Sequence, residues 1–389
     1  MSGGVDSSLA AFLLKERGYE VIGATMCIGM ADKTQKGPAR CCGIADIEDA
    51  RRVALQLEIP FYVFHVRDDF EREVIQYFCK EYVKGRTPNP CILCNERVKF
   101  GSFLRKAKEL GADYVSTGHY AQSELDEGTK RYVLKKGIDR RKDQSYVLFS
   151  LRQDQLRYIL FPLGGYRKEE VRKRAFQIGL RVHDKPESQE VCFVQDTSYH
   201  TFLLERLQNP IQPGPIIDRE GNILGRHRGV PFYTIGQRRG LGLAKGTPLY
   251  VVGIDLERNA IIVGEEKEVY ADSFTVDSVN WIVSTPHPPP PPLGGEGRGA
   301  AVQSCNSEFQ VRNGTLAPYG GGALTAQVKI RYNHPGAEAL LFLKGKDEVE
   351  VKFKTPQKAI TPGQAAVFYD GDTVLAGGWI KEVNRQQGE

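Results

Sequence analysis

Hydrophobic positions in the first 120 residues alternate between helical and strand-like spacing. Residues 5–17 place Leu9, Phe12 and Leu13 on one face of a predicted amphipathic helix, which ends at Gly18. Residues 19–26 then predict a buried strand. The alternation continues, with helices expected at 46–57, 68–82 and 103–110 and strands at 61–66 and 113–121. We therefore expect an α/β fold with a doubly wound parallel sheet, which binds ligands at the carboxyl ends of its strands.

The pattern changes after about residue 200. Short strand-like runs, such as 248–255, 324–332 and 365–380, alternate with turns rich in Gly, Asp and Pro, which is typical of an antiparallel barrel. We expect an α/β domain at 1–200, a small connecting domain at 201–270 and a C-terminal antiparallel β-barrel at 271–389. Residues 286–322 interrupt the barrel pattern with Pro and Gly, which predicts a disordered or semi-extended insertion outside the core.

Composition limits the class of protein. The 389 residues are 41% hydrophobic and 26% charged, as in globular proteins, and the net charge of +5 alone does not indicate a nucleic-acid partner. No apolar run reaches the roughly 18 residues of a membrane-spanning helix, and no secretory signal is seen. The 8 cysteines are too few for a disulfide framework. We expect a cytoplasmic protein with no membrane partner, whose cysteines are buried, metal-binding or catalytic.

The first candidate site is the segment that opens the first helix, Ser2-Gly3-Gly4-Val5-Asp6-Ser7-Ser8. Its glycines allow the backbone to curl around an anion at a helix N-terminus, and its serines add donors. A Walker A lysine is absent. Asp6 cannot bind phosphate directly but can hold a divalent metal. The segment resembles the phosphate loop of the ATP-pyrophosphatase superfamily, which cleaves ATP between its α- and β-phosphates, and by itself it also suits an amide-forming ligase.

Two cysteines lie far apart in the sequence among polar residues. Cys94 is expected in a Pro- and Asn-rich loop, and Cys192 follows an acidic stretch. Thiolates there can act as nucleophiles in sulfur transfer, one carrying a persulfide and the other aiding its release. Cys91-x-x-Cys94 and Cys192 also offer three thiolates for a [4Fe–4S] cluster, whereas zinc needs a fourth ligand such as Cys41 or Cys42. Spacing leaves these alternatives open, along with that of buried, inert thiols.

Three basic runs that contain or adjoin aromatic residues lie at 140–146, 167–174 and 226–239. Cations neutralise phosphates and aromatic rings stack on bases that have left a helix. One such run is typical of a solvated face. Three of them in a chain with a predicted β-barrel favour RNA binding.

Six further motifs resemble the tRNA-specific 2-thiouridylase family, occur in its order and span nearly the whole chain. They are GRTPNPCILCNERVKF at 85–100, STGHY at 116–120, RKDQSY at 141–146, EVCF at 190–193, YTIGQRRGLG at 233–242 and KIRY at 329–332. Three features depart from the family. The chain begins at the phosphate loop, where the family has a preceding apolar strand, which predicts an upstream start. The others are the insertion at 286–322 and Cys91, where many members have Asp.

The resemblance implies a fold, a reaction and its residues. The fold would be an ATP-pyrophosphatase domain, a connecting domain and a barrel. The reaction would be ATP-dependent 2-thiolation of the wobble uridine in tRNA, with Mg²⁺ and a separate sulfur-donor protein. Cys192 would carry the persulfide and Cys94 would be the nucleophile, with ATP on the phosphate loop, Met26 and Gly118. Positions matching the family's tRNA contacts are Asn89, Pro90, Cys91, His119, Lys142, Asp143, Gln144, Arg331, Tyr332 and Gln364.

Two rival functions remain from the residues themselves. One is a different ATP-pyrophosphatase enzyme that forms an amide on a small molecule, which would need neither the paired cysteines nor the basic barrel. The other is a non-enzymatic RNA-binding protein that keeps the fold.

Overall fold

The computed structural model divides into two compact units, each described here by itself. The first comprises Met1–Lys80, Asn89–Glu124 and Leu134–Pro210, and the second Glu81–Pro88, Leu125–Val133 and Ile211–Glu389. The structure describes residues 1–29, 44–186, 191–194, 199–207, 210–243, 246–283, 310–312, 315–317, 323–345 and 347–384. Two short stretches of the N-terminal half, Glu81–Pro88 and Leu125–Val133, therefore belong to the second unit.

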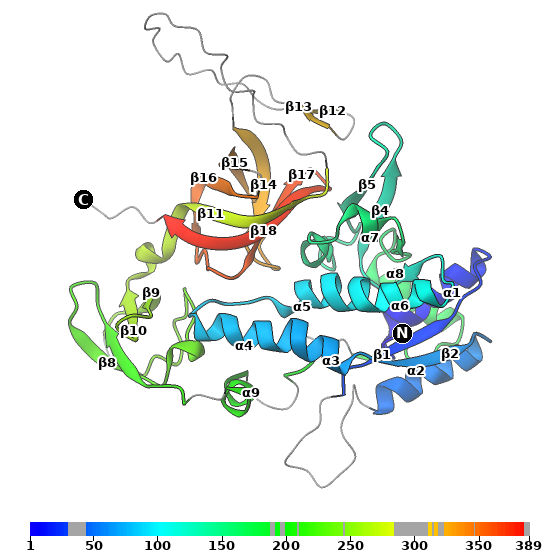
Figure 1. Cartoon of the computed structure of the whole chain (residues 1–389), viewed down its shortest axis with the longest axis horizontal. Coiled ribbons are helices and arrows are strands. Elements are labelled where there is room, and N and C mark those ends of the chain that lie inside the picture. Colours follow the sequence, from blue (N-terminus) through cyan, green and yellow to red (C-terminus); the bar gives the residue numbers. More distant parts are fainter. Residues whose placement is uncertain are drawn as a thin grey trace, which may run out of the picture. The chain divides into compact units, whose positions relative to one another are not determined.

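The N-terminal half alternates helices and strands, as the hydrophobic spacing predicts (Figure 1). Its elements are α1 (Val5–Glu16), β1 (Gly23–Cys27), α2 (Ile44–Gln56), β2 (Phe61–His65), α3 (Arg67–Phe70), η1 (Glu71–Ile75), α4 (Gln76–Val83), α5 (Pro90–Leu93), η2 (Cys94–Ser102), α6 (Phe103–Glu109), β3 (Val115–Ser116), β4 (Ala121–Asp126), β5 (Arg131–Lys136), η3 (Ser145–Leu148), α7 (Gln153–Leu156), β6 (Ile159–Leu160), α8 (Lys168–Gln177) and α9 (Tyr199–Arg206). The segments α3, η1 and α4 follow one another without a break, and so do α5, η2 and α6.

Four strands of the first unit, β1, β2, β3 and β6, pair in parallel, as predicted. β1 pairs with β2 in the register Gly23↔Phe61, and β3 pairs with β6 in the register Val115↔Ile159. Among the described residues these are two separate two-stranded sheets. The first residue already lies along β1, because the Met1 amine donates to the Ala24 carbonyl and the Thr25 hydroxyl donates to the Met1 carbonyl at 2.6 Å.

Helix α1 is held by its apolar face. Leu9 and Leu13 are buried in a cluster with Val171 and Ala175 of α8 and Val53 of α2. Burying these side chains fixes where the N-terminus of α1 points, and the candidate phosphate loop leads into that N-terminus. The packing of the helix therefore positions the loop.

The elements that follow residue 210 are mostly strands. They are β7 (Gly214–Ile217), β8 (Ile223–His227), η4 (Val230–Phe232), β9 (Tyr250–Asp255), β10 (Ala260–Gly264), η5 (Glu266–Val269), β11 (Tyr270–Trp281), β12 (Gln310–Arg312), β13 (Thr315–Ala317), β14 (Leu324–Lys329), β15 (Ala337–Leu343), β16 (Val349–Lys358), β17 (Ala365–Asp370) and β18 (Thr373–Asn384). Four of them form a sheet in the order β8-β7-β10-β9, in which only β7 and β10 run parallel.

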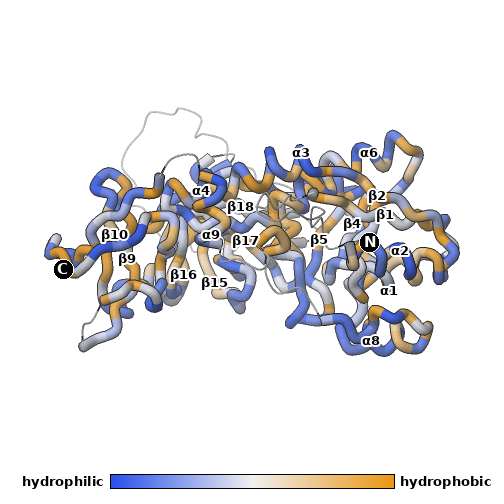
Figure 2. The backbone as a smooth tube through the Cα atoms, turned by 90° about the horizontal axis from the view of Figure 1, so that it is seen from below, coloured by the Kyte–Doolittle hydropathy of each residue, from blue (hydrophilic) through white to orange (hydrophobic). Residues whose placement is uncertain are grey.

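The predicted barrel is confirmed as a closed antiparallel structure (Figure 1). The order β11-β16-β15-β14-β17-β18 closes because β11 also pairs with β18. Buried apolar side chains from all six strands fill it, among them Phe274, Val328 and Phe368. Figure 2 shows hydrophobic stretches along β17, in contrast to the hydrophilic α8. A closed sheet leaves no unpaired edge, which explains why these short strands form one stable body.

Some predictions fall partly or wholly outside the described residues. Cys41, Cys42 and Cys305 lie there, and so does most of the insertion at 286–322. Within that insertion the structure describes only β12 and β13, which pair with each other antiparallel in the register Gln310↔Ala317. The prediction of a disordered or semi-extended insertion outside the core stays a prediction.

Candidate active site

The phosphate loop leads directly into α1, whose N-cap is Gly4. The Ser7 and Ser8 hydroxyls donate to the Gly4 carbonyl at 3.2 and 2.8 Å, and the Ser2 amide donates to the Ser7 hydroxyl at 3.0 Å. The loop is thus shaped by its own serines. Because Gly4 provides no side-chain cap, the amides of the first helical turn are left for another acceptor, as an anion site requires.

Two glycines allow the close approaches that build the loop. Gly3 has a φ of +70°, and a Cβ there would lie 2.3 Å from the Asp46 carbonyl oxygen at the start of α2. A Cβ on Gly118 would lie 2.8 Å from both the Asp6 carbonyl carbon and the Ser7 nitrogen. The structure therefore brings Gly118 against the loop. Met26 lies half-buried on β1, next to Thr25, which bonds to the Met1 carbonyl.

Asp6 is held by two side chains that the sequence analysis did not select. The Lys168 ammonium lies 2.7 and 2.8 Å from the two Asp6 carboxylate oxygens, and the Tyr120 hydroxyl donates to the carboxylate at 2.7 Å. Lys168 is the first residue of α8, and its side chain is only 9% exposed. The loop without a Walker lysine therefore has a lysine beside it, supplied from another part of the chain.

A second lysine binds the other end of the loop. The Lys185 ammonium lies 2.7 Å from carboxylate oxygens of both Asp46 and Asp49 and donates to the Gly3 carbonyl at 3.1 Å. Burial opposes protonation of Lys185, but the two aspartates outweigh it and raise the pKa of the ammonium. Gly3 is therefore fixed to the first turns of α2 by a permanent positive charge.

No pattern in the neighbouring sequence predicts the ion pairs of Lys168 and Lys185, because their aspartate partners lie more than 130 positions away. Lys168 belongs to the basic run at 167–174, which we expected to face RNA. Two other members of that run also have partners within the unit, because Arg172 donates to the His183 carbonyl at 2.9 Å and Arg174 donates to the Tyr166 hydroxyl at 3.0 Å.

Cys94 lies in a helix, so the prediction of a loop around it is wrong. Helix α5 begins at Pro90, with Asn89 as N-cap, and the Asn89 side chain accepts from the Cys91 amide at 3.2 Å. An Asn followed by Pro is a helix-start signal, which the sequence analysis took for a loop. Cys94 is half-buried in the first turns, and Cys91 is exposed.

Cys192 lies in a short turn with an exposed thiol. The next residue, Phe193, is buried against Phe70 and Phe78, with ring centroids 5.7 and 5.2 Å apart. This aromatic contact fixes the turn to the helix formed by α3, η1 and α4. Cys91, Cys94 and Cys192 form no disulfide. Within the described ranges, no group of three or more His, Cys, Asp or Glu could hold a metal, so the [4Fe–4S] prediction is not supported.

Three predicted tRNA contacts of the first unit, Lys142, Asp143 and Gln144, are consecutive, and Gln144 is connected to the phosphate loop. The Gln144 side-chain oxygen accepts a hydrogen bond from the Tyr120 backbone amide at 3.0 Å. The Tyr120 hydroxyl in turn donates to the Asp6 carboxylate. Asp143 is buried and accepts from the Ser145 amide and hydroxyl, both at 3.0 Å, while Lys142 is half-buried. The turn at 142–144 is thereby connected to Asp6.

His119 is buried between the rings of Phe100 and Phe161, with centroids 6.1 and 6.0 Å away. Its Nδ1 lies 2.7 Å from the Thr117 hydroxyl oxygen. Burial, with a smaller contribution from the Lys99 charge, holds the pKa of His119 well below its usual range. The imidazole is therefore neutral at physiological pH, and its contact with tRNA stays a prediction.

In the second unit, the predicted tRNA contacts differ in exposure. Arg331 is exposed and donates to the Lys358 carbonyl at 3.0 Å, and Tyr332 beside it is half-buried. Gln364 is half-buried, and its side-chain amide donates to the Thr87 carbonyl at 2.8 Å. The residues around Gln364 contain no local signal for its hydrogen bond to Thr87.

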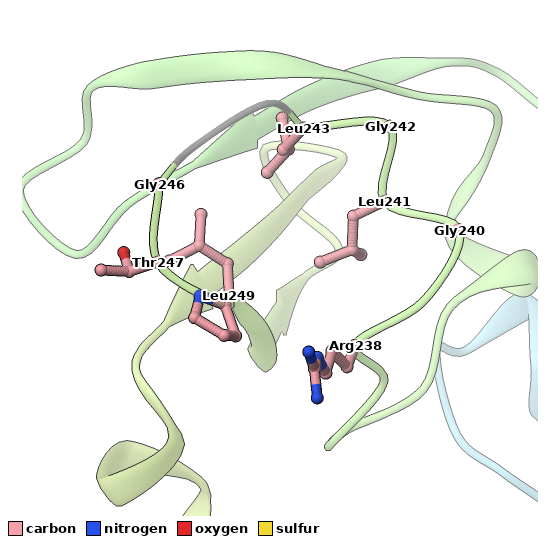
Figure 3. Close-up of a pocket in the computed structure, with 9 residues that line it drawn as sticks. Arg238, Gly240, Leu241, Gly242, Leu243, Gly246, Thr247 and Leu249 are labelled. Atoms are coloured by element: carbon pink, nitrogen blue, oxygen red, sulfur yellow. The ribbon is translucent and has the colours of Figure 1, made fainter.

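A cavity of about 350 Å³ lies in the second unit and is lined by residues 238, 240–243 and 246–249 (Figure 3). Arg238 and Leu241 point toward the same space, and Gly240 and Gly242 have φ values of +75° and +69°. Left-handed backbone at two glycines lets the loop curve around this space. Part of its lining, from Arg238 to Gly242, belongs to the YTIGQRRGLG motif at 233–242, which resembles the 2-thiouridylase family.

Comparison with known proteins covers almost the whole chain. Three family models match in succession: the tRNA methyl transferase HUP domain at residues 1–196, the tRNA methyl transferase PRC-barrel domain at 200–265 and the aminomethyltransferase beta-barrel domain at 271–380. No helix in the described part of the chain is long and apolar enough to cross a membrane.

Curated relatives match over more than nine tenths of their length. The chain is 46% identical over 383 residues to a tRNA-specific 2-thiouridylase MnmA of Acetivibrio thermocellus, covering 98% of each chain. It is 47% identical over 382 residues to that of Heliobacterium modesticaldum and 42% identical over 382 residues to that of Clostridioides difficile. These two alignments cover 98% of this chain and 91% and 97% of the relatives.

Proposed function

The chain belongs to the family of tRNA-specific 2-thiouridylases, and from that membership we propose that it replaces the 2-oxygen of the wobble uridine in tRNA with sulfur at the expense of ATP. The observation that carries the proposal is the uncapped glycine loop at the start of α1 with the Lys168–Asp6 pair beside it. A non-enzymatic RNA-binding protein would not need an anion site built in this way. Cys94 and Cys192, which form no disulfide, favour sulfur transfer over amide formation.

We propose that the phosphates of ATP lie on the loop Ser2–Ser8, with the amides of the first turn as donors and Lys168 as the cation. Met26 and Gly118 would contact the adenine side. Mg²⁺ is usually held by one or two carboxylates together with substrate phosphates, and Asp6 fits that requirement. When bound, Mg²⁺ would neutralise phosphate charge, while Lys168 and Tyr120 hold the Asp6 carboxylate in place.

The uridine is activated first. Its O2 attacks the α-phosphorus of ATP, pyrophosphate leaves, and the oxygen becomes part of an adenylate. The adenylate is a good leaving group, whereas the original oxygen is a poor one. The base must leave its stack to reach the site, and the segment Asn89–Cys91 at the start of α5 would contact it, with His119, Lys142, Asp143, Gln144, Arg331, Tyr332 and Gln364 as further tRNA contacts.

Sulfur transfer follows at the two cysteines. The terminal sulfur of a persulfide on Cys192 bonds to C2 of the uridine, and AMP leaves with the former O2. The Cys94 thiolate then attacks the Cys192 sulfur, which breaks its bond to the transferred sulfur and releases 2-thiouridine. The resulting Cys94–Cys192 disulfide is reduced by an external thiol. A separate sulfur-donor protein would reload Cys192, and free thiols and a tRNA substrate suit the cytoplasm.

The test is mass spectrometry of nucleosides from tRNA incubated with the protein, ATP and a sulfane-sulfur donor that loads Cys192 as a persulfide. We expect 2-thiouridine from the wild type and none from Cys192→Ser, which should still exchange pyrophosphate with ATP when tRNA is present. Exchange without tRNA would favour the amide-forming ligase, and no exchange at all would favour a non-enzymatic RNA-binding protein.

Cys79→Ala is the matched control for the cysteine variants. Cys79 is buried on α4, and burial raises the pKa of its thiol to about 11, so it is not a nucleophile at neutral pH. The control should thiolate tRNA like the wild type. Persulfide label appearing only on Cys41 or Cys305, and not on Cys192, would contradict the assignment.

A further inference from the structure

The segment Glu81–Pro88, called here the strap, joins α4 to α5 and belongs to the second unit. It runs directly into Asn89, the N-cap of the helix that carries Cys94. The strap is therefore the piece of chain through which the second unit is covalently connected to the start of that helix.

Thr87 uses every polar group it has to bind distant parts of the second unit. Its amide donates to the Pro362 carbonyl at 3.0 Å, and its carbonyl accepts from the Gln364 side chain at 2.8 Å. Its hydroxyl shares a hydrogen bond with the hydroxyl of Thr234. Thr87 thus connects the turn before β17 with the YTIGQRRGLG motif at 233–242.

The neighbours of Thr87 are held just as closely. The Arg86 guanidinium donates to the Ile380 carbonyl of β18 at 3.0 Å and pairs with Glu81 at 3.1 Å. Gly363 has a φ of +88°, and a Cβ there would lie 2.9 Å from the Arg86 Cβ and 3.0 Å from the Thr87 nitrogen. The strap can approach the barrel this closely only because residue 363 is a glycine.

A short piece of chain joins the strap to Cys94. Only Pro88 separates Thr87 from the N-cap Asn89, and the first helical residue is also a proline. Two prolines with fixed φ angles leave this connection little freedom. From Pro90 the helix continues without a break to Glu109, and Cys94 is part of it.

We propose that Thr87 is a positioning residue for sulfur transfer: through Gln364 and Thr234 the strap sets the position of the Cys94 helix according to whether tRNA occupies the barrel. The inference rests on the proposed function, because it takes Gln364 as a tRNA contact and Cys94 as the nucleophile. It goes beyond that function in assigning a task to Thr87 and Thr234, neither of which needs to touch substrate.

The experiment compares Thr87→Val with Thr87→Ser, since valine keeps the shape of threonine but removes the hydroxyl. At saturating tRNA, ATP and persulfide-loaded Cys192, we expect Thr87→Val to slow single-turnover thiolation by about 10- to 100-fold, as misplacement of a reacting group does. The tRNA dissociation constant, ATP binding and persulfide loading of Cys192 should change little. Thr87→Ser should recover most of the rate. Thr275→Val on β11 is the matched control and should behave like the wild type.

A second readout follows the thiol itself. The rate at which iodoacetamide alkylates Cys94, measured by mass spectrometry, should change when tRNA binds the wild type and should lose that response in Thr87→Val and Thr234→Val. Thr234→Val breaks the same Thr87–Thr234 hydrogen bond by removing the other hydroxyl. The test can therefore be carried out with either variant if the other fails to fold. An unaltered rate and an unaltered tRNA response in either folded variant would overturn the proposal. Absence of 2-thiouridine from the wild type would instead overturn the proposed function, and the alkylation response would still report on the strap.

Discussion

The closed barrel packs apolar side chains inward from all six of its strands, whereas the first unit buries several polar and charged ones. Phe274, Val328 and Phe368 are typical of the barrel interior. Buried polar residues of the first unit include Asn95, His119, Asp143, Gln155 and Lys168. The barrel interior is thus mainly apolar, whereas the first unit combines an apolar cluster around α1 with buried polar side chains.

The buried polar side chains of the first unit hold helices and turns near the candidate active site. Gln155 donates to the Glu96 and Phe100 carbonyls at 2.9 and 2.7 Å, and Asn95 donates to the Val147 carbonyl at 3.0 Å. Burying a polar group costs free energy unless it is bonded, so these networks fix loop geometry rather than add much net stability. The comparison indicates that the barrel is built for stability and the first unit for placing functional groups.

The largest expected effect is on the barrel. Phe274→Ala should lower its free energy of unfolding by about 3–5 kcal/mol, because Phe274 is fully buried and packs on Phe353. Both tryptophans, Trp281 and Trp379, lie on barrel strands, so their fluorescence in a urea titration reports on this unit. Phe342→Ala, at a side chain 36% exposed, is the control and should cost below about 1 kcal/mol. Equal losses would contradict an interior held by apolar packing.

Next in size is the charged pair of the first unit. Lys168→Met should leave Asp6 without its counter-ion. We expect the free energy of unfolding to fall by about 2–3 kcal/mol. This is at or below the loss on breaking a buried ion pair, because Asp6 is 30% exposed. Far-UV circular dichroism should show an earlier transition while the tryptophan transition stays in place. Adding Asp6→Asn should restore part of the loss, because the unpaired charge is then gone. A shift of the tryptophan transition alone would show that the two units are not separable in this way.

The phosphate loop should respond more weakly but more locally. Gly3→Ala places a Cβ at a φ of +70° and against the Asp46 carbonyl, so both strain and a clash are introduced. Gly18→Ala, at a φ of +86° with nothing within 4 Å, has the strain alone, worth about 1–2 kcal/mol. Titration calorimetry should therefore show ATP affinity lost in Gly3→Ala and kept in Gly18→Ala. Equal ATP binding by the two variants would exclude the loop as the anion site.

The smallest expected effect is a dependence of stability on pH, and we expect it in both units. Burial is the main cause that lowers the pKa of His119 in the first unit and of His227 and His334 in the second. A histidine with a lowered folded-state pKa contributes stability above its unfolded value of about 6.5, and this is lost as the pH falls from there through the folded value. Urea midpoints of both units should thus fall between about pH 7.5 and 5.5. His334→Gln should reduce the fall of the tryptophan midpoint, and an unchanged fall would rule out its contribution.

Local patterns in the sequence predicted much of the fold. The apolar spacing around Leu9 and Leu13, with Gly18 behind it, located α1, and the strand-like runs after residue 200 located the barrel. The helix start at Asn89 and Pro90 was also present in the sequence as an N-cap followed by proline, and its misinterpretation as a loop concealed that Cys94 is helical. These features rest on a few neighbouring residues, so the chain shows them without its tertiary structure.

The sequence by itself determined the glycine loop, the cysteines and the order of motifs, because each depends on residue type at short spacing. Only the tertiary structure decided what surrounds them. Lys168 reaches Asp6 across 162 positions, Lys185 reaches Gly3 across 182, and Gln364 reaches Thr87 across 277. Such contacts depend on how helices and strands far apart in the chain pack together. The spacing of residues within one short segment therefore does not predict them. The physical reason is that the spacing of apolar residues within one segment determines which face of a helix or strand is buried. Packing between segments far apart in the chain determines which side chain contacts that face.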